Sequence, residues 1–244
     1  MTHPPHHRDE QGNILFLILL AVVLFAALSY AVTSSTRGGG KDASAETYIA
    51  YTSEMLNYVT LLEQTVTRLQ LSNGCTDRQI SFETPGSSDY TNSLTPADGR
   101  CKLFDPAGGG MALQTVNDKL LISDAEALAT SWGASFGTGS RGKHVFPNQV
   151  YVPNIGGTSD CTNGACRSLV VGFAWVKKEA CDAINAKLGI TSGTGGYPIG
   201  GLTDFFKGTF TAAGQVANTN SNRTACVYNT TAYGNAFIHV LKLR

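Results

Sequence analysis

The sequence has little charge and no excess of either sign. Lysine and arginine together number 18, aspartate and glutamate also number 18, and charged residues make up 15% of the 244 positions. A protein that binds nucleic acid needs a basic face to neutralise phosphates. The charge balance therefore argues against nucleic acid as a partner. The chain is still long enough to bury a substantial core.

Cysteine is absent from the first 74 residues and occurs six times afterwards, at Cys75, Cys101, Cys161, Cys166, Cys181 and Cys226. A structural zinc site needs close pairs of ligands. Four residues separate Cys161 from Cys166, and no second close pair exists. An even number of cysteines after an apolar segment instead favours disulfides in an oxidising compartment.

The connectivity of six cysteines stays open, because many pairings are possible. Proximity along the chain favours Cys161–Cys166 and Cys75–Cys101 as local loops, which leaves Cys181–Cys226 as the longer connection.

Complete catalytic motifs are also missing. No G-x-S-x-G sequence occurs. Residues 137–144, GTGSRGKH, match the first part of a phosphate-binding loop, but His144 replaces the required Ser or Thr, so we expect an ordinary loop. His239 lies in a strand-like alternation that favours packing over catalysis. We therefore expect no enzyme activity, no catalytic residue, no metal site and no cofactor.

The sequence has one long apolar run, Ile14 to Val32. This run carries no charge and comes after the polar residues 1–12. As a helix it would be about 28 Å long, close to the hydrocarbon thickness of a bilayer. A cleaved signal peptide is the alternative, with small residues at Ser29–Tyr30–Ala31. The run is longer than the apolar core of a usual signal peptide. The positive charge of Arg8, which precedes the run, is balanced by acidic neighbours, whereas a signal peptide begins with net positive charge. Both features favour a helix that is retained.

A second helix is predicted over residues 41–70, after an interruption by the three glycines at 38–40. Its apolar residues recur every three or four positions and so share one face: Tyr48, Tyr51, Met55, Tyr58, Leu62, Val66 and Leu69. Gly74 is a suitable C-terminal stop. This pattern predicts a helix that packs one face against its own domain.

Beyond Gly74, short apolar segments alternate with Gly, Pro, Asn and Asp, which is typical of an α+β domain with long loops. Residues 167–176 read as a buried strand, 177–189 as a helix that ends at Gly189, and 235–244 as a final strand. Residues 202–214 are ambiguous.

These features together resemble a type IV prepilin or pseudopilin, in particular the type IVb-like branch. A polar leader ends in Gly12, and an apolar helix, an amphipathic helix and a cysteine-containing domain follow. FAWVKKEACDAINAKLG (173–189) looks like the family's strand and helix that bear the first cysteine of a C-terminal disulfide. ACVYNT and FIHVLKLR (225–244) look like the closing part with the second cysteine.

The resemblance implies how the N-terminus is processed and used. A dedicated prepilin peptidase and methylase would cut between Gly12 and Asn13 and methylate Asn13. Ile14, Leu15, Phe16 and Leu17 would begin an assembly helix that is first held in membrane lipid and later packs in a filament core. The expected partners are other pilin subunits, this peptidase and an inner-membrane assembly platform, without nucleic acid.

The implied fold is α+β, with a long N-terminal α-helical stem packed on a disulfide-bonded antiparallel-sheet head. The expected parts are a leader (1–12), a transmembrane or filament-core helix (13–37), an amphipathic stem helix (38–70) and a globular head (71–244). The protein would cross the bacterial inner membrane once, with its head in the periplasm or on an extracellular filament.

Leu17 departs from the family pattern. Most pilins carry a glutamate as the fifth mature residue, and its absence is found in some minor subunits at a filament tip. The expected function is therefore a minor pilin or pseudopilin of a type IV pilus or a type II secretion-like filament. The alternative is an anchored or secreted adhesin-like protein that does not polymerise, with a ligand at polar loops such as 189–201 and 216–224.

Overall fold

The computed structural model describes residues 11–37, 39–130, 139, 141–148, 150–152, 155, 168–190, 205–210, 215–216, 219–228 and 234–242. The chain divides into two compact units, Met1–Glu46 and Thr47–Arg244. We call them the N-terminal unit and the C-terminal unit, and describe each by itself.

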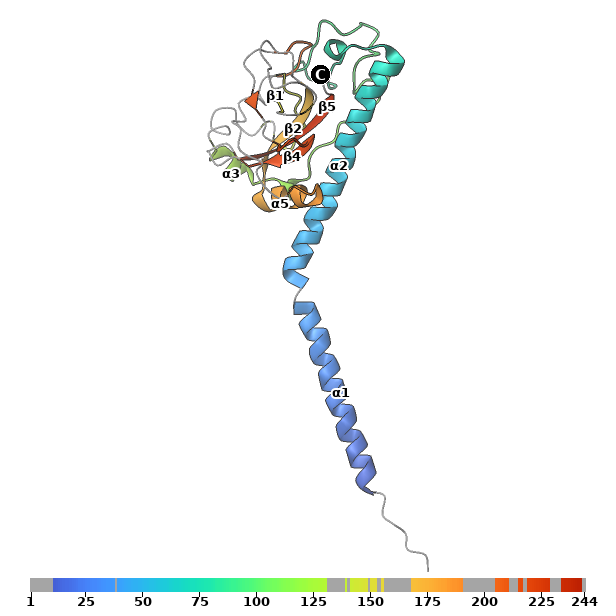
Figure 1. Cartoon of the computed structure of the whole chain (residues 1–244), viewed down its shortest axis with the longest axis vertical. Coiled ribbons are helices and arrows are strands. Elements are labelled where there is room, and N and C mark those ends of the chain that lie inside the picture. Colours follow the sequence, from blue (N-terminus) through green and yellow to red (C-terminus); the bar gives the residue numbers. More distant parts are fainter. Residues whose placement is uncertain are drawn as a thin grey trace, which may run out of the picture. The chain divides into compact units, whose positions relative to one another are not determined.

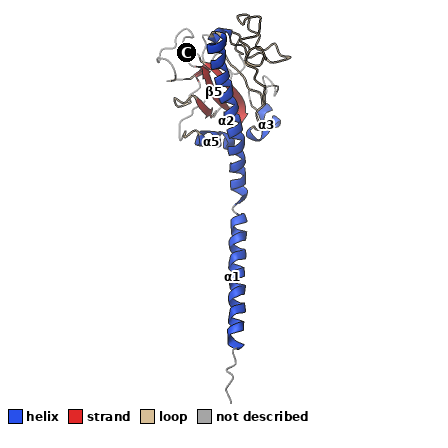
Figure 2. Cartoon of the chain, turned by 90° about the vertical axis from the view of Figure 1, so that its right-hand side faces the viewer, coloured by secondary structure: helices blue, strands red, loops and turns tan. Residues whose placement is uncertain are grey.

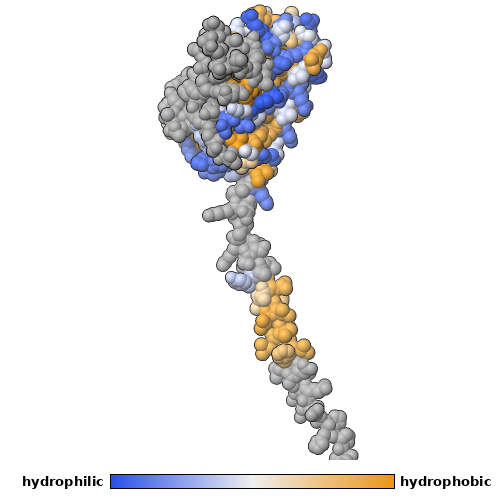
Figure 3. Space-filling view, in the orientation of Figure 1, coloured by the Kyte–Doolittle hydropathy of each residue, from blue (hydrophilic) through white to orange (hydrophobic). Residues whose placement is uncertain are grey.

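The N-terminal unit contains helix α1 (Gln11–Arg37). Its described side chains, from Phe16 to Tyr30, are all exposed and are mostly large and apolar (Figure 3). Within the part of the chain that the structure describes, no helix combines the length and the hydropathy needed to cross a membrane. The membrane span expected at 13–37 stays a prediction.

Two of the three glycines at 38–40, which were expected to interrupt a helix, lie within helix α2 (Gly39–Asn73). The predicted apolar face is confirmed. Met55, Tyr58, Leu62, Val66 and Leu69 are buried, while Tyr48 and Tyr51 pack on the same core.

The end of α2 also agrees with the sequence. Gly74 has φ of +67°, a left-handed conformation that glycine adopts without strain. The N–H of Cys75 then donates to the carbonyl of Leu69 at 3.2 Å. The chain thus reverses at Gly74 and enters the loops of the C-terminal unit.

The C-terminal unit has an α+β fold built on a three-stranded antiparallel sheet. Its strands are β2 (Leu169–Val176), β4 (Thr224–Val227) and β5 (Asn235–Lys242), in the order β2-β5-β4. The last strand in the sequence therefore occupies the centre of the sheet (Figure 1).

Smaller elements surround this sheet. Helix α5 (Lys178–Lys187) follows β2 and ends before Gly189, close to the predicted 177–189. The others are two 3-10 turns (Asp77–Gln79 and Asp118–Leu120), α3 (Asp124–Leu128), and a parallel pair formed by β1 (Val150–Tyr151) and β3 (Gln215–Val216). In the ambiguous segment 202–214, the described residues 205–210 contain no helix.

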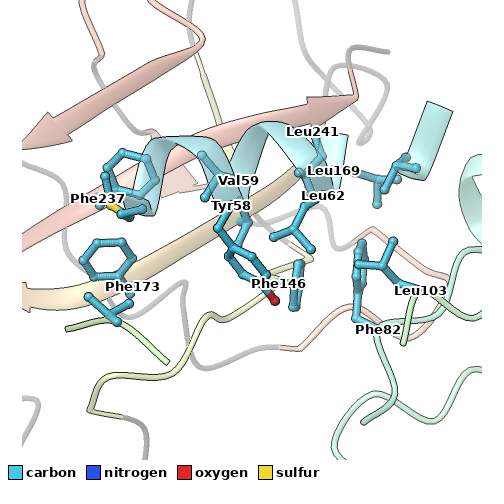
Figure 4. Close-up of a cluster of buried hydrophobic side chains, with 14 of the residues drawn as sticks. Tyr58, Val59, Leu62, Phe82, Leu103, Phe146, Leu169, Phe173, Phe237 and Leu241 are labelled. Atoms are coloured by element: carbon cyan, nitrogen blue, oxygen red, sulfur yellow. The ribbon is translucent and has the colours of Figure 1, made fainter. Parts of the chain in front are cut away.

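Both faces of the sheet are buried, which explains why every residue of β2 is buried. Helix α2 covers one face (Figure 2). In this core Tyr58, Val59 and Leu62 of α2 lie close to a group of aromatic side chains that includes Phe146 and Phe173 (Figure 4). The opposite face packs on residues of α3, β1 and neighbouring loops, among them Ala127, Val145 and Val150.

A bulge in β2 changes which side chains face which core. Ala174 pairs with Ala236 and Val176 with Asn235, so Trp175 has no partner residue in β5. The φ of Trp175 is +61°, which an L-residue adopts only at an energetic cost. As a result Ala174 and Trp175 both pack in the core away from α2, and Trp175 is completely buried.

Two of the three expected disulfides are confirmed, Cys75–Cys101 and Cys181–Cys226. The second bond joins α5 to the edge strand β4. The buried amide of Asn185 strengthens this junction, because it donates to the carbonyl of Cys226 at 2.8 Å and accepts from its N–H at 2.9 Å. Cys161 and Cys166 lie outside the described residues.

Candidate functional site

The described surface of α1 is apolar on every side. The consecutive residues Phe16 to Leu20 are between 46% and 65% exposed, and Phe25 is 75% exposed. A helix turns about 100° per residue, so five consecutive side chains cover its whole circumference. Burying each such side chain would contribute about 1.5–3 kcal/mol. This surface is therefore the strongest candidate for a contact with a partner or an apolar phase.

The residues expected to direct processing and assembly all lie in α1. Gly12, Asn13, Ile14 and Leu15 are in its helical backbone, and their side chains lie outside the described part. Phe16 and Leu17 are exposed, at 65% and 58%. Leu17 thus adds to the apolar surface of α1.

In the C-terminal unit, a polar cluster joins α2 to the sheet. Glu63 of α2 accepts a hydrogen bond from Arg223 at 2.6 Å, and its second carboxylate oxygen lies 3.3 Å from Nε2 of His239. The Nδ1 atom of His239 lies 2.7 Å from the hydroxyl of Thr224. One carboxylate on α2 therefore contacts both β5 and the residue preceding β4.

The order hydroxyl, imidazole, carboxylate also occurs in hydrolases, where the hydroxyl must meet a substrate. Here His239 is buried, and both of its ring nitrogens face protein groups. Burial lowers the pKa of His239; the nearby Glu63 carboxylate opposes this shift and Arg223 adds to it. This geometry is that of a polar contact that holds α2 against the sheet.

His144 occupies the other notable position in this unit. Its Nδ1 atom donates to the carbonyl of Gln114 at 3.1 Å, and its ring lies 4.9 Å from that of Tyr58 and 5.7 Å from that of Phe173, between ring centroids. The described residues 141–148, which end the expected loop 137–144 and follow it, form no helix. A phosphate-binding loop requires a helix that follows it, so His144 serves the core here.

Burial lowers the pKa of His144 to about 4, although its hydrogen bond to Gln114 acts in the opposite direction. The unfolded chain binds this proton near pH 6.5, whereas the folded chain does not. Stability is therefore fully present above about pH 6.5 and falls as the pH drops towards 4, by about 3 kcal/mol in total. Urea unfolding, followed by tryptophan fluorescence between pH 7 and pH 4, should show this decline.

The matched variant is His144→Asn, which removes the titrating group. Its unfolding free energy should depend much less on pH, and the remaining slope should come in part from His239, whose pKa is also lowered. Equal slopes in the two proteins would contradict the assignment of this pH dependence to His144.

The sequence did not identify Glu63 or Tyr58 as parts of polar contacts. Glu63 falls off the apolar face of α2 and therefore resembles a solvated residue; its partners are 160 and 176 positions away. Tyr58 was predicted as a packing residue, and its hydroxyl in addition donates to the carbonyl of Ala112 at 3.0 Å. Contacts of such long range leave no periodic signal in a single sequence.

Comparison of the chain with protein-family models, with curated proteins and with solved structures gives no match.

Proposed function

We propose that this protein is a pilin-like structural subunit that is anchored in a membrane and assembles through α1. The observation that carries the proposal is the exposed apolar circumference of α1 between Phe16 and Tyr30. A helix that first lies in lipid and then packs among other helices must be apolar on all sides. Within the described part of its own unit, the side chains of α1 from Phe16 to Tyr30 are all exposed.

The contrast between the two long helices supports this proposal. Helix α2 buries one face, from Met55 to Leu69, against the sheet of its own domain. Helix α1 is exposed all round in its described part. A subunit needs both kinds of helix if one packs on its own folded domain and the other contacts neighbouring subunits.

The C-terminal part of the chain supports the same reading. Strand β2 leads into α5, which carries Cys181, and Cys226 lies on β4 immediately before the last strand. The resemblance to the type IVb-like branch rests on this order. Two disulfides also suit a domain that works outside the cytosol.

Leu17 favours a minor subunit or pseudopilin over a major one. A carboxylate in a filament core would be costly unless a neighbour supplied its partner. With leucine at this position, the subunit joins a filament through apolar packing and does not supply the charge found in most pilins.

The mass of the intact protein, extracted from membranes of a host that has prepilin peptidase, tests this proposal. We expect a chain that begins at Asn13 and carries one additional methyl group. Gly12→Asp, at the cut, should retain the leader, while the matched change Ala31→Asp should leave the mature N-terminus unaltered. A chain that begins at Val32 would instead identify a cleaved signal peptide and refute the proposal.

A further inference from the structure

A small pocket lies between α2 and the segment 114–117, within the C-terminal unit. Its volume is about 150 Å³, and it is partly enclosed. Tyr51, Glu54 and Tyr58 line it from α2, and His144 also borders it. None of these side chains takes part in the proposed assembly through α1.

The charge of this pocket is negative at neutral pH. Among the described residues that line it, Glu54 carries the one carboxylate, and burial lowers the pKa of His144, which keeps that imidazole uncharged. Glu54 is also exposed, so its carboxylate can reach a guest without strain. The pocket therefore favours a cation over an anion.

Several hydrogen-bond donors next to the pocket are already used within the protein. The Tyr58 hydroxyl donates to Ala112 and accepts from the N–H of Gln114 at 3.2 Å. Nδ1 of His144 donates to the carbonyl of Gln114, and the N–H of Val116 donates to Gly142 at 2.8 Å. A ligand that supplies hydrogen-bond donors therefore fits this pocket better than a ligand that needs donors from the protein.

Aromatic side chains provide the remaining feature. Tyr51 and Tyr58 both line the pocket, and the face of a tyrosine ring attracts a cation within about 6 Å. A carboxylate beside aromatic rings is a chemical environment that suits an ammonium group. The small volume favours a slender guest such as a straight alkyl chain.

We propose that this pocket binds a primary ammonium group, either at the end of a lysine side chain of another protein or in a free alkylamine. The Glu54 carboxylate forms the ion pair, and the half-buried ring of Tyr51 lies beside the alkyl chain. This inference does not depend on the pilin-like function, because it concerns the C-terminal unit alone.

The experiment titrates the full chain, in detergent, with Nα-acetyl-lysine-methylamide and follows tyrosine and histidine resonances by NMR. The norleucine analogue, which lacks the ammonium group, serves as the neutral counterpart. We expect saturable binding of the lysine compound and at least tenfold weaker binding of the analogue. Equal binding of both compounds, or binding of neither, would overturn the proposal.

Glu54→Gln should weaken binding of the lysine compound at least fivefold without a change in melting temperature. Glu46→Gln, an exposed change on the same helix outside the pocket, should leave binding unaltered. Unchanged affinity in Glu54→Gln would refute the role of the carboxylate. A lysine-containing peptide that binds more tightly than butylammonium indicates a protein partner, and equal affinities indicate a free amine.

Discussion

Replacing Cys181 and Cys226 together by alanine is expected to lower the free energy of unfolding by about 4 kcal/mol. The bond closes a loop with a sequence separation of 45 residues, so its removal restores much conformational freedom to the unfolded chain. Both cysteines are completely buried at the contact of α5 with β4. Urea unfolding under non-reducing conditions, at neutral pH, measures the loss.

The companion variant replaces Cys75 and Cys101 by alanine. Its loop has a shorter sequence separation, 26 residues, so the expected loss is slightly smaller, about 3.5 kcal/mol. Each double variant retains the other bond, which separates the two contributions in a way that a reducing agent cannot. A loss of less than about 1 kcal/mol in the Cys181 variant would show that Asn185 and the core suffice to hold α5 on β4.

Gly109→Ala is expected to destabilise the C-terminal unit by about 3 kcal/mol or more. A Cβ atom at this position would lie 2.2 Å from the carbonyl oxygen of Leu103 and 2.9 Å from Cγ2 of Thr65 on α2. The first neighbour is backbone and cannot rotate away. The carbonyl of Gly109 also accepts a hydrogen bond from Arg68 at 2.5 Å, so a shift of this loop would break its contact with α2.

Gly139→Ala is the control for this prediction. Among the described residues, no atom lies within 4 Å of a Cβ atom placed there, and the φ of Gly139 is not in the left-handed range. We expect its melting temperature to stay within about 2 °C of the parent value, since surface changes usually alter stability by less than about 0.5 kcal/mol. Similar melting temperatures for the two alanine variants would show that the loop at 103–109 adapts.

The elements that follow a short-range pattern were predictable from the sequence. The apolar face of α2, the strand β2, the helix α5 and the final strand β5 all appear close to their expected bounds. In each of them the spacing of the apolar residues is typical of its own type of secondary structure. Proximity along the chain favoured Cys75–Cys101 and left Cys181–Cys226 as a pair, while the connectivity itself stayed open; the structure contains both bonds.

The loops between α2 and β2 could not be predicted. Phe82 and Phe146 stack with ring centroids 4.0 Å apart, yet they lie 64 positions apart in irregular segments. The bulge at Trp175 was also hidden, because an apolar run that is buried on both faces shows no alternation to interrupt. Tertiary packing decides such features.

The candidate sites divide in the same way. The apolar surface of α1 could be read directly, because it is a property of adjacent residues. The pocket beside Glu54 and the contacts of Glu63 unite residues that are far apart in the sequence, so only the folded chain reveals them.

The central place of β5 has a consequence for biosynthesis. A chain made from its N-terminus delivers β2 and β4 before β5, and these two strands do not pair with each other. The sheet can form only when residues 235–242, which form β5, have been made. Until then the apolar face of α2 cannot pack on the sheet. Cys181 and Cys226 are also not yet held next to each other by the sheet. The polypeptide therefore needs protection from aggregation until β5 has been made.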